Sequence, residues 1–469
     1  MENRKMTLST RYKWKTARES ECSLRPSLIN YAFVVCMVWI GMSSHLGLGQ
    51  TSQTEPEGWN QWRGPGGTGA SQTAQPPTRW SENENVKWKT KIDGLGHSSP
   101  VIWKDTVFLT TAIPFGPAFD PIYDNAPGSH DNKAVTQKFR FAMIAVDRVS
   151  GKIKWQKTLH EAVPHEGSHV SGSLASGSPV VDADHVFAYF GSYGIYCLDH
   201  DGNRVWSKSF GRMDTKHAHG EGASPALDDD LLVINWDHEG SSFIVALEKS
   251  TGNEIWRRDR QEVTSWSSPI IHRFNDRRQV IVAGTGAVRG YDASTGKTIW
   301  ECSGLSHNIV ATPIAKGAKV YVGSSYEIKS MMAINLDGAA GDITGTDKVI
   351  WKRASRTPYV PTPLLYRNRL YFLRHYQGIL TVADASNGDE NIGPFRLPGI
   401  RDIYASPVAA DGRIYITSRE GVTLVLSEKE MPRLLAVNRL SDAFNASPAM
   451  VGNQLLLRGE NFLYCLCND

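Results

Sequence analysis

The sequence is poor in cysteine: it has six in 469 residues, and no pair has the C-x-x-C spacing of a zinc or redox site. Four lie beyond the first 50 residues, at Cys197, Cys302, Cys465 and Cys467. Cys465 and Cys467 alternate along one expected strand and so point to the same side. We interpret the four as buried apolar thiols. A disulfide of Cys197 or Cys302 in an oxidising compartment is the alternative.

The sequence also lacks an excess of charge outside its first residues. The formal net charge is +3, and residues 1–27 carry seven Lys or Arg against three Glu. The remainder of the chain is therefore close to neutral. A near-neutral chain has no electrostatic footprint for nucleic acid, so we expect no nucleic-acid partner.

The apolar run behind this basic front is short. Leu28–Met42 has 15 residues, fewer than a membrane span needs. Small residues follow it, and the chain has neither a twin arginine nor a lipidation box there. Residues 1–50 are therefore predicted to be a Sec-type secretory signal, started at Met1 or Met6. The protein would then be periplasmic, in the cell envelope, or secreted. An uncleaved signal, which would attach the chain to a membrane, stays open.

A small residue followed by proline recurs along the chain, each time at the start of a short apolar run. The intervals between these corners are 79, 46, 44, 44, 50, 44 and 41 residues. Between corners, a stretch such as residues 223–256 reads as four short strands joined by tight turns. Eight corners with this period predict an all-β, eight-bladed β-propeller with four antiparallel strands per blade. The corner prolines are Pro100, Pro179, Pro225, Pro269, Pro313, Pro363, Pro407 and Pro448.

A glycine followed by a tryptophan four residues later marks the far end of several units. The pairs are Gly151 and Trp155, Gly202 and Trp206, Gly252 and Trp256, and Gly296 and Trp300; Trp351 is a looser match. We expect these tryptophans to pack between blades. With Trp88 of the first strand, the predicted docking residues are Trp88, Trp155, Trp206, Trp256, Trp300 and Trp351.

The last unit supplies three strands, and a strand at about 85–92 is predicted to complete it. Such closure removes the exposed sheet edge of an open ring. The expected organisation is a signal at 1–50, an irregular segment at 51–84 and the propeller at 85–469. Trp59, Trp62 and Trp80 should hold the irregular segment in place. The first blade carries an insertion at about 113–138, predicted to be a surface lid or partner-binding loop. Its aspartates, including Asp131, do not fit an EF-hand spacing.

Residues 147–155 (DRVSGKIKW) and 292–300 (DASTGKTIW) resemble the tryptophan-docking repeat of pyrroloquinoline quinone (PQQ) propellers. Ala145, Asp147, Gly151 and Trp155 match this repeat, whereas Glu248 stands where Asp is usual. The opening WNQWRGPGGTGAS also resembles the start of secreted PQQ-like proteins of planctomycete-type bacteria. The resemblance covers roughly residues 85–469.

This resemblance implies two different kinds of protein. Quinoprotein alcohol dehydrogenase-like enzymes hold PQQ and calcium in the central funnel and carry an adjacent Cys-Cys pair, which this sequence lacks. Proteins of the BamB type have the same ring, no cofactor, and bind protein partners. We therefore carry over no catalytic residue and expect no cofactor, with PQQ and calcium as the alternative.

Polar residues collect in two kinds of loop, those before the corners and those between the second and third strands, which share one face of a propeller. One mouth of the ring should therefore be rich in histidine, including His130. The candidate binding residues are His97, His165, His169, His217, His219, His238, Trp266, His307, Arg374, His375, Arg401 and Tyr404. Trp266 could stack on a planar ligand or pack over the channel, and variable polar loops would also produce this pattern.

No metal site is assigned from the sequence. The best local candidate set is His217, His219 and Glu221, because residues two apart point the same way on an extended segment. His-x-His alone has low specificity, and such a site would need further ligands at about 2 Å from the ion.

The sequence predicts an exported, monomeric, non-catalytic binding or scaffolding protein of the cell envelope. Its partner, a protein or a carbohydrate, would bind at the histidine-rich mouth. A PQQ- or metal-dependent oxidoreductase is the alternative, and a lyase or hydrolase using the histidines is a third reading.

Overall fold

The structure is a computed structural model that describes residues 58–468, apart from residues 125, 391 and 430. The predicted signal at residues 1–50 lies outside the described residues. Among the residues described, no helix has the length and apolar character needed to cross a membrane.

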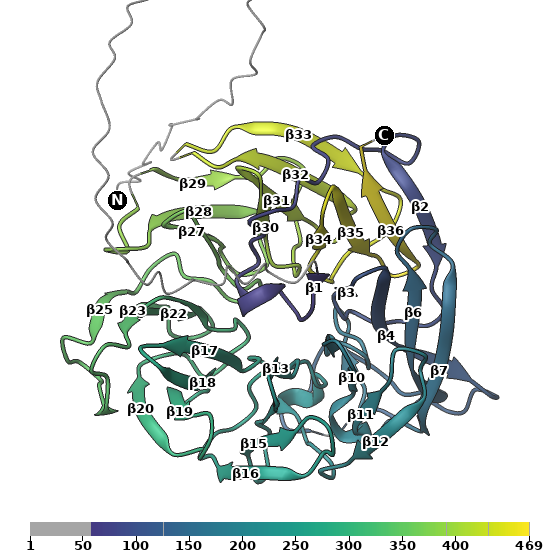
Figure 1. The fold of residues 1–469 in the computed structure, drawn as a ribbon, viewed down its shortest axis with the longest axis horizontal. Coiled ribbons are helices and arrows are strands. Elements are labelled where there is room, and N and C mark those ends of the chain that lie inside the picture. Colours follow the sequence, from purple (N-terminus) through teal and green to yellow (C-terminus); the bar gives the residue numbers. More distant parts are fainter. Residues whose placement is uncertain (1–57, 125, 391, 430, 469) are drawn as a thin grey trace, which may run out of the picture. The chain divides into compact units, whose positions relative to one another are not determined.

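Eight small antiparallel sheets stand around a common axis, which confirms the predicted eight-bladed propeller (Figure 1). The first blade is formed by β3 (Val101–Trp103), β4 (Thr106–Phe115), β6 (Lys138–Asp147) and β7 (Ile153–Ala162), and the second by β9 (Val180–Val181), β10 (Val186–Tyr189), β11 (Ile195–Leu198) and β12 (Arg204–Lys208). The third blade is formed by β13 (Ala226–Asp228), β14 (Leu231–Trp236), β15 (Phe243–Glu248) and β16 (Glu254–Asp259). The fourth is formed by β17 (Ile270–Phe274), β18 (Arg277–Ala283), β19 (Ala287–Asp292) and β20 (Thr298–Ser303).

The other four blades follow in chain order. The fifth blade is formed by β21 (Ile314–Lys316), β22 (Lys319–Ser324), β23 (Ser330–Asn335) and β25 (Val349–Arg353), and the sixth by β26 (Leu364–Tyr366), β27 (Arg369–Leu373), β28 (Ile379–Asp384) and β29 (Ile392–Arg396). The seventh blade is formed by β30 (Val408–Ala410), β31 (Arg413–Thr417), β32 (Val422–Ser427) and β33 (Leu434–Arg439). The eighth is formed by β34 (Ala449–Val451), β35 (Gln454–Arg458), β36 (Phe462–Cys467) and β2 (Val86–Lys91). β2 pairs antiparallel with β36, so segments from opposite ends of the described chain share the eighth blade.

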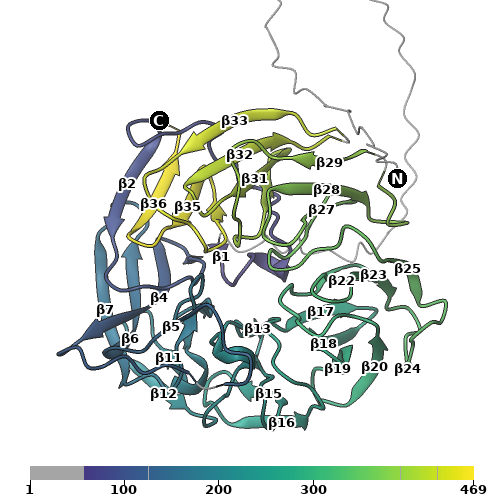
Figure 2. The same cartoon turned by 180° about the vertical axis from the view of Figure 1, so that it is seen from behind.

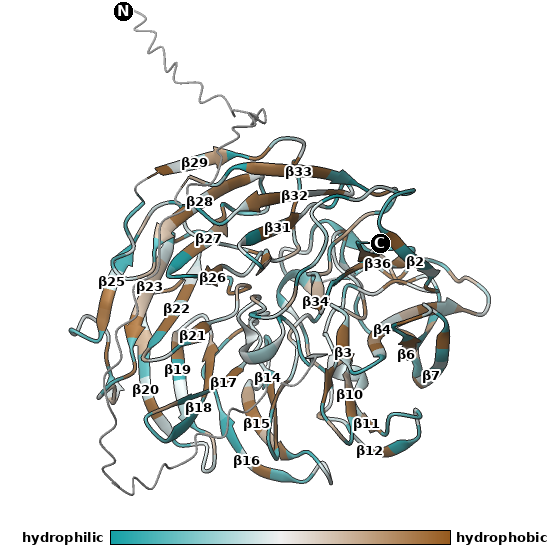
Figure 3. Ribbon diagram, turned by 45° about the horizontal axis from the view of Figure 1, so that its top comes forward, coloured by the Kyte–Doolittle hydropathy of each residue, from teal (hydrophilic) through white to brown (hydrophobic). Residues whose placement is uncertain are grey.

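Burial explains why the inner and middle strands of a blade are continuously apolar, whereas apolar and polar residues alternate along the outer strands. Every residue of β14 is buried, because neighbouring blades cover both faces of its sheet. The outer strand β16 has only Trp256 buried. Figure 3 shows brown and teal stretches along the blade strands, with paler or teal loops between them. All four described cysteines are free thiols, and Cys197, Cys302 and Cys465 are buried.

The corners form a belt of hydrogen bonds around the axis. Each corner has Ser or Thr before its proline, and the backbone N–H of one corner donates to the side-chain hydroxyl of the next. Seven such bonds, each 2.9–3.0 Å, run from blade to blade through Ser99, Ser178, Ser224, Ser268, Thr312, Thr362, Ser406 and Ser447. This hydroxyl belt satisfies buried donors that a proline-bound corner would otherwise leave unpaired.

Tryptophans of one blade dock on glycine turns of the next. The indole N–H of Trp206 donates to the Lys249 carbonyl at 2.9 Å, and a Cβ at Gly252 would lie 2.7 Å from the Trp206 ring. The same pairing joins Trp88 with Gly151, Trp155 with Gly202, Trp256 with Gly296 and Trp351 with Gly388. These glycines have φ of +69° to +81°, so they also supply the left-handed turn.

Trp300 departs from this pattern. Its indole N–H donates to Gln279 of its own blade at 2.9 Å, and the ring lies over Gly290 of that blade. In the fifth blade the turn that should receive it is replaced by a longer excursion. That excursion places β24 (Gly341–Asp342) in parallel beside β20 as a fifth strand.

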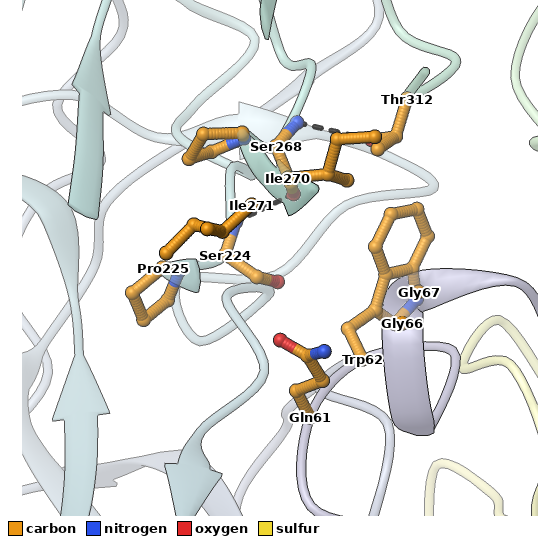
Figure 4. Close-up of a pocket in the computed structure, with 11 residues that line it drawn as sticks. Gln61, Trp62, Gly66, Gly67, Ser224, Pro225, Ser268, Ile270, Ile271 and Thr312 are labelled. Carbon is orange, nitrogen blue, oxygen red and sulfur yellow. Dashed lines mark hydrogen bonds between the residues drawn. The ribbon is translucent and has the colours of Figure 1, made fainter. Parts of the chain in front are cut away.

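The N-terminal segment, residues 58–85, crosses the ring. β1 (Gly58–Trp59) pairs with β3, and the short helix η1 (Pro65–Gly67) lies near the ring axis (Figure 1). The buried guanidinium of Arg63 donates to the corner carbonyls of Pro363 and Pro407. The buried rings are Trp59 and Trp80, whereas Trp62 is half-buried. Figure 4 shows Gln61 and Trp62 facing Ser224, Ser268 and Thr312 across a small pocket.

The insertion of the first blade runs from residue 116 to 137, because β4 and β6 are each slightly longer than expected. Its strand β5 (Asn132–Lys133), labelled in Figure 2, pairs with β8 (Ser168–His169), which precedes the second corner. The insertion is thereby held against the loop that precedes the second blade.

Candidate functional site

A cavity of about 420 Å³ opens at the mouth of the ring. Its side walls come from the loops before the corners and from the loops between second and third strands. Trp62 of the N-terminal segment lines both this cavity and the small pocket beside η1, so that segment closes the inner end. The aromatic, imidazole and amide groups in the lining are Trp62, His97, His130, His169, His217, His219, Trp266, Asn308, Tyr326, Tyr359, His375, Tyr376, Tyr404 and Asn445.

The structure brings seven of the twelve candidate mouth residues into this cavity: His97, His169, His217, His219, Trp266, His375 and Tyr404. The other five do not line it. His165 and His238 are hydrogen-bonded within the loops, whereas His307, Arg374 and Arg401 are exposed to solvent. Trp266 donates its indole N–H to the Gly220 carbonyl at 2.7 Å, which fixes its ring at the cavity wall.

Several lining aromatics were not among the candidates. Tyr326 and Tyr376 follow the second strands of their blades, and Tyr359 precedes the Pro363 corner. Extending the loop sorting from histidine to tyrosine would have found all three. Trp62 could not be found this way, because the N-terminal segment has no place in the repeat.

Four histidines from three separate loops meet at one side of the cavity: His130, His169, His217 and His219, here called the histidine cluster. The ring centroids of His130, His217 and His219 are 4.8, 5.1 and 5.4 Å apart in pairs. His169 lies 4.8 Å from His219 by the same measure. The pairing of β5 with β8 brings the insertion, with His130, to the loop of His169.

The segment carrying His217 and His219 is not extended, so the expectation that these side chains share one side of a strand is wrong. Lys216–Ala218 forms the short helix η3, with φ of +59° at His217 and +52° at Ala218. Left-handed backbone is unusual for residues other than glycine and is often found at functional sites. The Asn132 side chain donates to the His217 carbonyl at 2.8 Å and helps to hold this turn.

Glu221, the third member of the predicted set, lies elsewhere. Its carboxylate accepts hydrogen bonds from the Ser192 N–H at 2.7 Å and the Ser192 hydroxyl at 2.5 Å. Together with His165 and Glu166 it forms a set whose ligand atoms lie within 4.8 Å of one another. Burial raises the pKa of Glu221 to about 8. Both ring nitrogens of His165 already contact Met213 and Tyr193, so this set reads as a structural network.

Burial lowers the pKa of four lining histidines, His97, His169, His219 and His375, and so favours their uncharged form near neutral pH. Burial lowers the pKa of His219 to about 4, and the adjacent His169 adds to this shift. Burial, with the nearby Lys133, Arg458 and Arg419, lowers the pKa of His97 to about 3. Asp131 is the only Asp, Glu, Lys or Arg among the residues that line the cavity.

The other side of the cavity is an aromatic wall, formed by Tyr326, Tyr359, His375, Tyr376 and Tyr404. The rings of Tyr376 and Tyr404 are stacked at 5.9 Å with an angle of 4°, and those of Tyr326 and Tyr359 at 5.6 Å with an angle of 22°. His375 lies between the pairs, 5.2 Å from Tyr359 and 6.0 Å from Tyr376. His375 has φ of +52°, so this wall too contains an unusual backbone position.

The fold and its cavity define a closed eight-bladed propeller of tryptophan-docked repeats with a polar, aromatic mouth. The family model described as outer membrane protein assembly factor BamB matches residues 116–258 and 240–465. The chain therefore belongs to this family of PQQ-like propellers. No curated protein matches the chain.

Solved structures resemble the chain in fold alone. BamB from Moraxella catarrhalis is 15% identical, with a TM-score of 0.39 over 85% of this chain and 96% of that one. Quinohemoprotein alcohol dehydrogenase from Comamonas testosteroni is 14% identical, with a TM-score of 0.47 over 88% and 80% of the two chains. The computationally designed Ika8 protein is 11% identical, with a TM-score of 0.48 over 81% and 99%.

The lining of the cavity does not fit PQQ with calcium. PQQ is a planar tricarboxylate, and buried carboxylates need cationic or other strong partners. No Lys or Arg is among the residues that line the cavity, and Asp131 is its single carboxylate for a calcium ion. We therefore derive no chemical step through this cofactor.

Proposed function

We propose that this chain is an exported, non-catalytic binding protein of the cell envelope that takes its partner at the mouth cavity. The observation that carries the proposal is the cavity itself, about 420 Å³ of open space between an aromatic wall and a histidine cluster. This volume falls within the range of ligand sites, whose walls combine aromatic faces with a few polar groups.

The lining selects an uncharged, hydroxyl-rich segment, and a carbohydrate chain has this chemistry. Stacked tyrosine rings offer flat faces to the C–H side of a sugar, while Asn308, Asn445 and several serines offer hydrogen bonds. The ring nitrogens of the lining histidines offer further hydrogen bonds. A charged ligand would find almost no opposite charge in the lining.

A protein partner is the second candidate, because the matching family is described as an outer membrane protein assembly factor. The exposed apolar side chains of Ile122, Tyr123, Val170 and Ile328, which belong to loops around the cavity, would suit such a partner.

Binding of the full chain to a panel of neutral and charged oligosaccharides, followed by titration calorimetry, tests the proposal. Tyr376→Ser removes an exposed ring of the aromatic wall and should weaken binding about tenfold, equivalent to about 1.4 kcal/mol. Tyr123→Ser is the matched control, since Tyr123 is exposed but does not line the cavity. Binding only to charged glycans, or equal binding by both variants, would contradict the carbohydrate proposal. Cross-linking to an envelope protein through the cavity would favour the second candidate.

A further inference from the structure

The proposed function gives the histidine cluster only a general hydrogen-bonding role and does not explain why four histidines meet at one place. Its members come from three loops that are distant in the chain, at residues 130, 169 and 217–219, and the insertion of the first blade is folded over the mouth to complete it. His130 is exposed, and His217 and His219 are half-buried, so solutes can reach the rings.

We propose that His130, His217 and His219 bind a divalent transition-metal ion of the zinc class. Zinc binds imidazole nitrogen at about 2.0–2.1 Å with tetrahedral angles, which places the centroids of bound rings about 5 Å apart. The three observed separations, 4.8, 5.1 and 5.4 Å, have this size.

The hydrogen bonds of the three imidazole rings are a second, independent observation that supports a metal site. His130 Nδ1 lies 2.7 Å from the Gly128 carbonyl oxygen, and His217 Nδ1 lies 3.1 Å from that of Pro127. His219 Nε2 lies 3.2 Å from the carbonyl oxygen of His130. Metal-ligating histidines commonly donate one N–H to a backbone carbonyl, which fixes the tautomer and leaves the other nitrogen for the ion. Here the available atoms are His130 Nε2, His217 Nε2 and His219 Nδ1.

The backbone around the cluster is shaped for these rings. A Cβ at Gly128 would lie 2.7 Å from His217 Nδ1, so only glycine allows the insertion to approach that ring. His217, Ala218 and Asp131 all have left-handed φ of +52° to +59°. Such positions persist where the surrounding structure holds them, and they collect at ligand sites.

Binding would require the rings to turn about their side-chain bonds, because the available nitrogens must converge on the ion. The donor atoms of another set, His165, Glu166 and Glu221, already converge. These atoms, however, are hydrogen-bonded to Met213, Thr215 and Ser192, respectively. Donors that already have protein partners leave little capacity for an ion. Three protein ligands at the histidine cluster would leave a coordination position facing the cavity for an oxygen atom of the ligand.

Zinc titration of the full chain tests the inference without any partner, so it can fail or succeed separately from the proposed function. The protein is purified without a polyhistidine tag, stripped with a chelator, and titrated with Zn²⁺ by calorimetry. We expect one equivalent to bind. Co²⁺ in its place should give the intense visible bands of a four- or five-coordinate site.

The double variant His217→Ala, His219→Ala should weaken zinc binding at least a hundredfold, and His130→Ala, in an exposed loop, at least tenfold. The matched control is His272→Ala, His307→Ala, which removes two histidines outside the cavity and should bind zinc as the unaltered chain does. Far-UV circular dichroism checks that each variant is folded.

Three results would overturn the inference: no zinc bound by the unaltered chain, full binding by the folded His130→Ala variant, or loss of binding in Glu166→Gln, Glu221→Gln with the histidine variants unaffected. The last result would assign the ion to the other set.

Discussion

At the residue scale, one type of hydrogen bond, repeated seven times, joins the blades. From the second corner to the eighth, the Ser or Thr hydroxyl before the proline accepts the N–H of the preceding corner. The eight corner residues are only 1–5% exposed. A missing hydroxyl would leave a buried donor unpaired, which costs more than the bond itself contributes.

Ser224→Ala should therefore lower the free energy of unfolding by about 1–3 kcal/mol, because the Ser178 N–H loses its acceptor. Urea unfolding followed by tryptophan fluorescence measures the change. Ser355→Ala, at an exposed serine, is the control and should change stability little. Equal effects of the two substitutions would contradict a structural role for the belt.

His97 makes the stability of the fold sensitive to acid. Its folded-state pKa of about 3 lies below the ordinary value of 6.5, because burial and the charges of Lys133, Arg458 and Arg419 oppose the imidazolium. As pH falls below 6.5, the unfolded chain binds a proton that the folded chain does not. Stability is thus lost between about pH 6.5 and pH 3.

Between pH 7 and pH 5 this histidine should account for up to about 2 kcal/mol of the loss. His97→Asn should flatten the dependence of the unfolding free energy on pH over that range, whereas His307→Asn, at an exposed histidine, should leave it as it is. An unchanged slope in the His97 variant would show that another group dominates the acid response.

At the element scale, the contact between an outer strand and the next blade depends on a glycine. Gly252 combines a φ of +73° with a Cβ position 2.7 Å from the Trp206 ring, whereas Gly317 has a φ of +54° and nothing within 4 Å. A substitution at Gly317 therefore measures the cost of the left-handed backbone conformation without any steric contact of the added methyl.

Gly317→Ala should cost about 1–2 kcal/mol from left-handed backbone strain. Gly252→Ala should cost about 1–3 kcal/mol more, because the added methyl displaces a docked tryptophan. Thermal unfolding of the two variants measures the difference, and equal losses would mean that the docked ring moves aside freely.

Trp300 shows that the repeat predicts the position of a docking tryptophan but not its contact. Its sequence context matches Trp256 closely, yet its partner is Gln279 within the same blade. The difference arises in the following unit, where the excursion between β23 and β25 removes the receiving turn. A motif thus predicts the tryptophan, but the neighbouring blade decides what it contacts.

At the scale of the whole propeller, the N-terminal segment connects distant blades and closes the inner end of the cavity. Arg63 is central to it, with a buried guanidinium whose pKa burial lowers to about 9. It donates to carbonyls of its own segment and of the corners at Pro363 and Pro407.

Arg63→Ala should lower the unfolding free energy by about 2–4 kcal/mol and expose residues 58–85 to proteases, since buried carbonyls lose charged donors. Arg79→Ala, at an exposed arginine of the same segment, is the control. Limited proteolysis with mass spectrometry reports the cut sites. Protection of this segment in both variants would show that Trp59 and Trp80 hold it without Arg63.

The repeat made the propeller predictable: the corner spacing, the glycine and tryptophan pairs and the loop classes all follow from local chemistry repeated at one period. The same logic placed His97, His169, His375 and Tyr404 at the mouth, and it would have found the tyrosines of the wall. It could also have found the hydroxyl belt, because Ser or Thr precedes every corner proline.

Other features depend on segments that lie outside the repeat. Arg63 and Trp62 belong to a segment whose path across the ring has no periodic signal, and the insertion that carries His130 is positioned by its pairing with β8. The left-handed turn at His217 likewise separates Glu221 from the histidines that precede it. Local sequence thus determined the strands, the blade count and the loops of the mouth. Only the tertiary structure decided which side chains meet there, because distances between separate loops are set by packing across the ring.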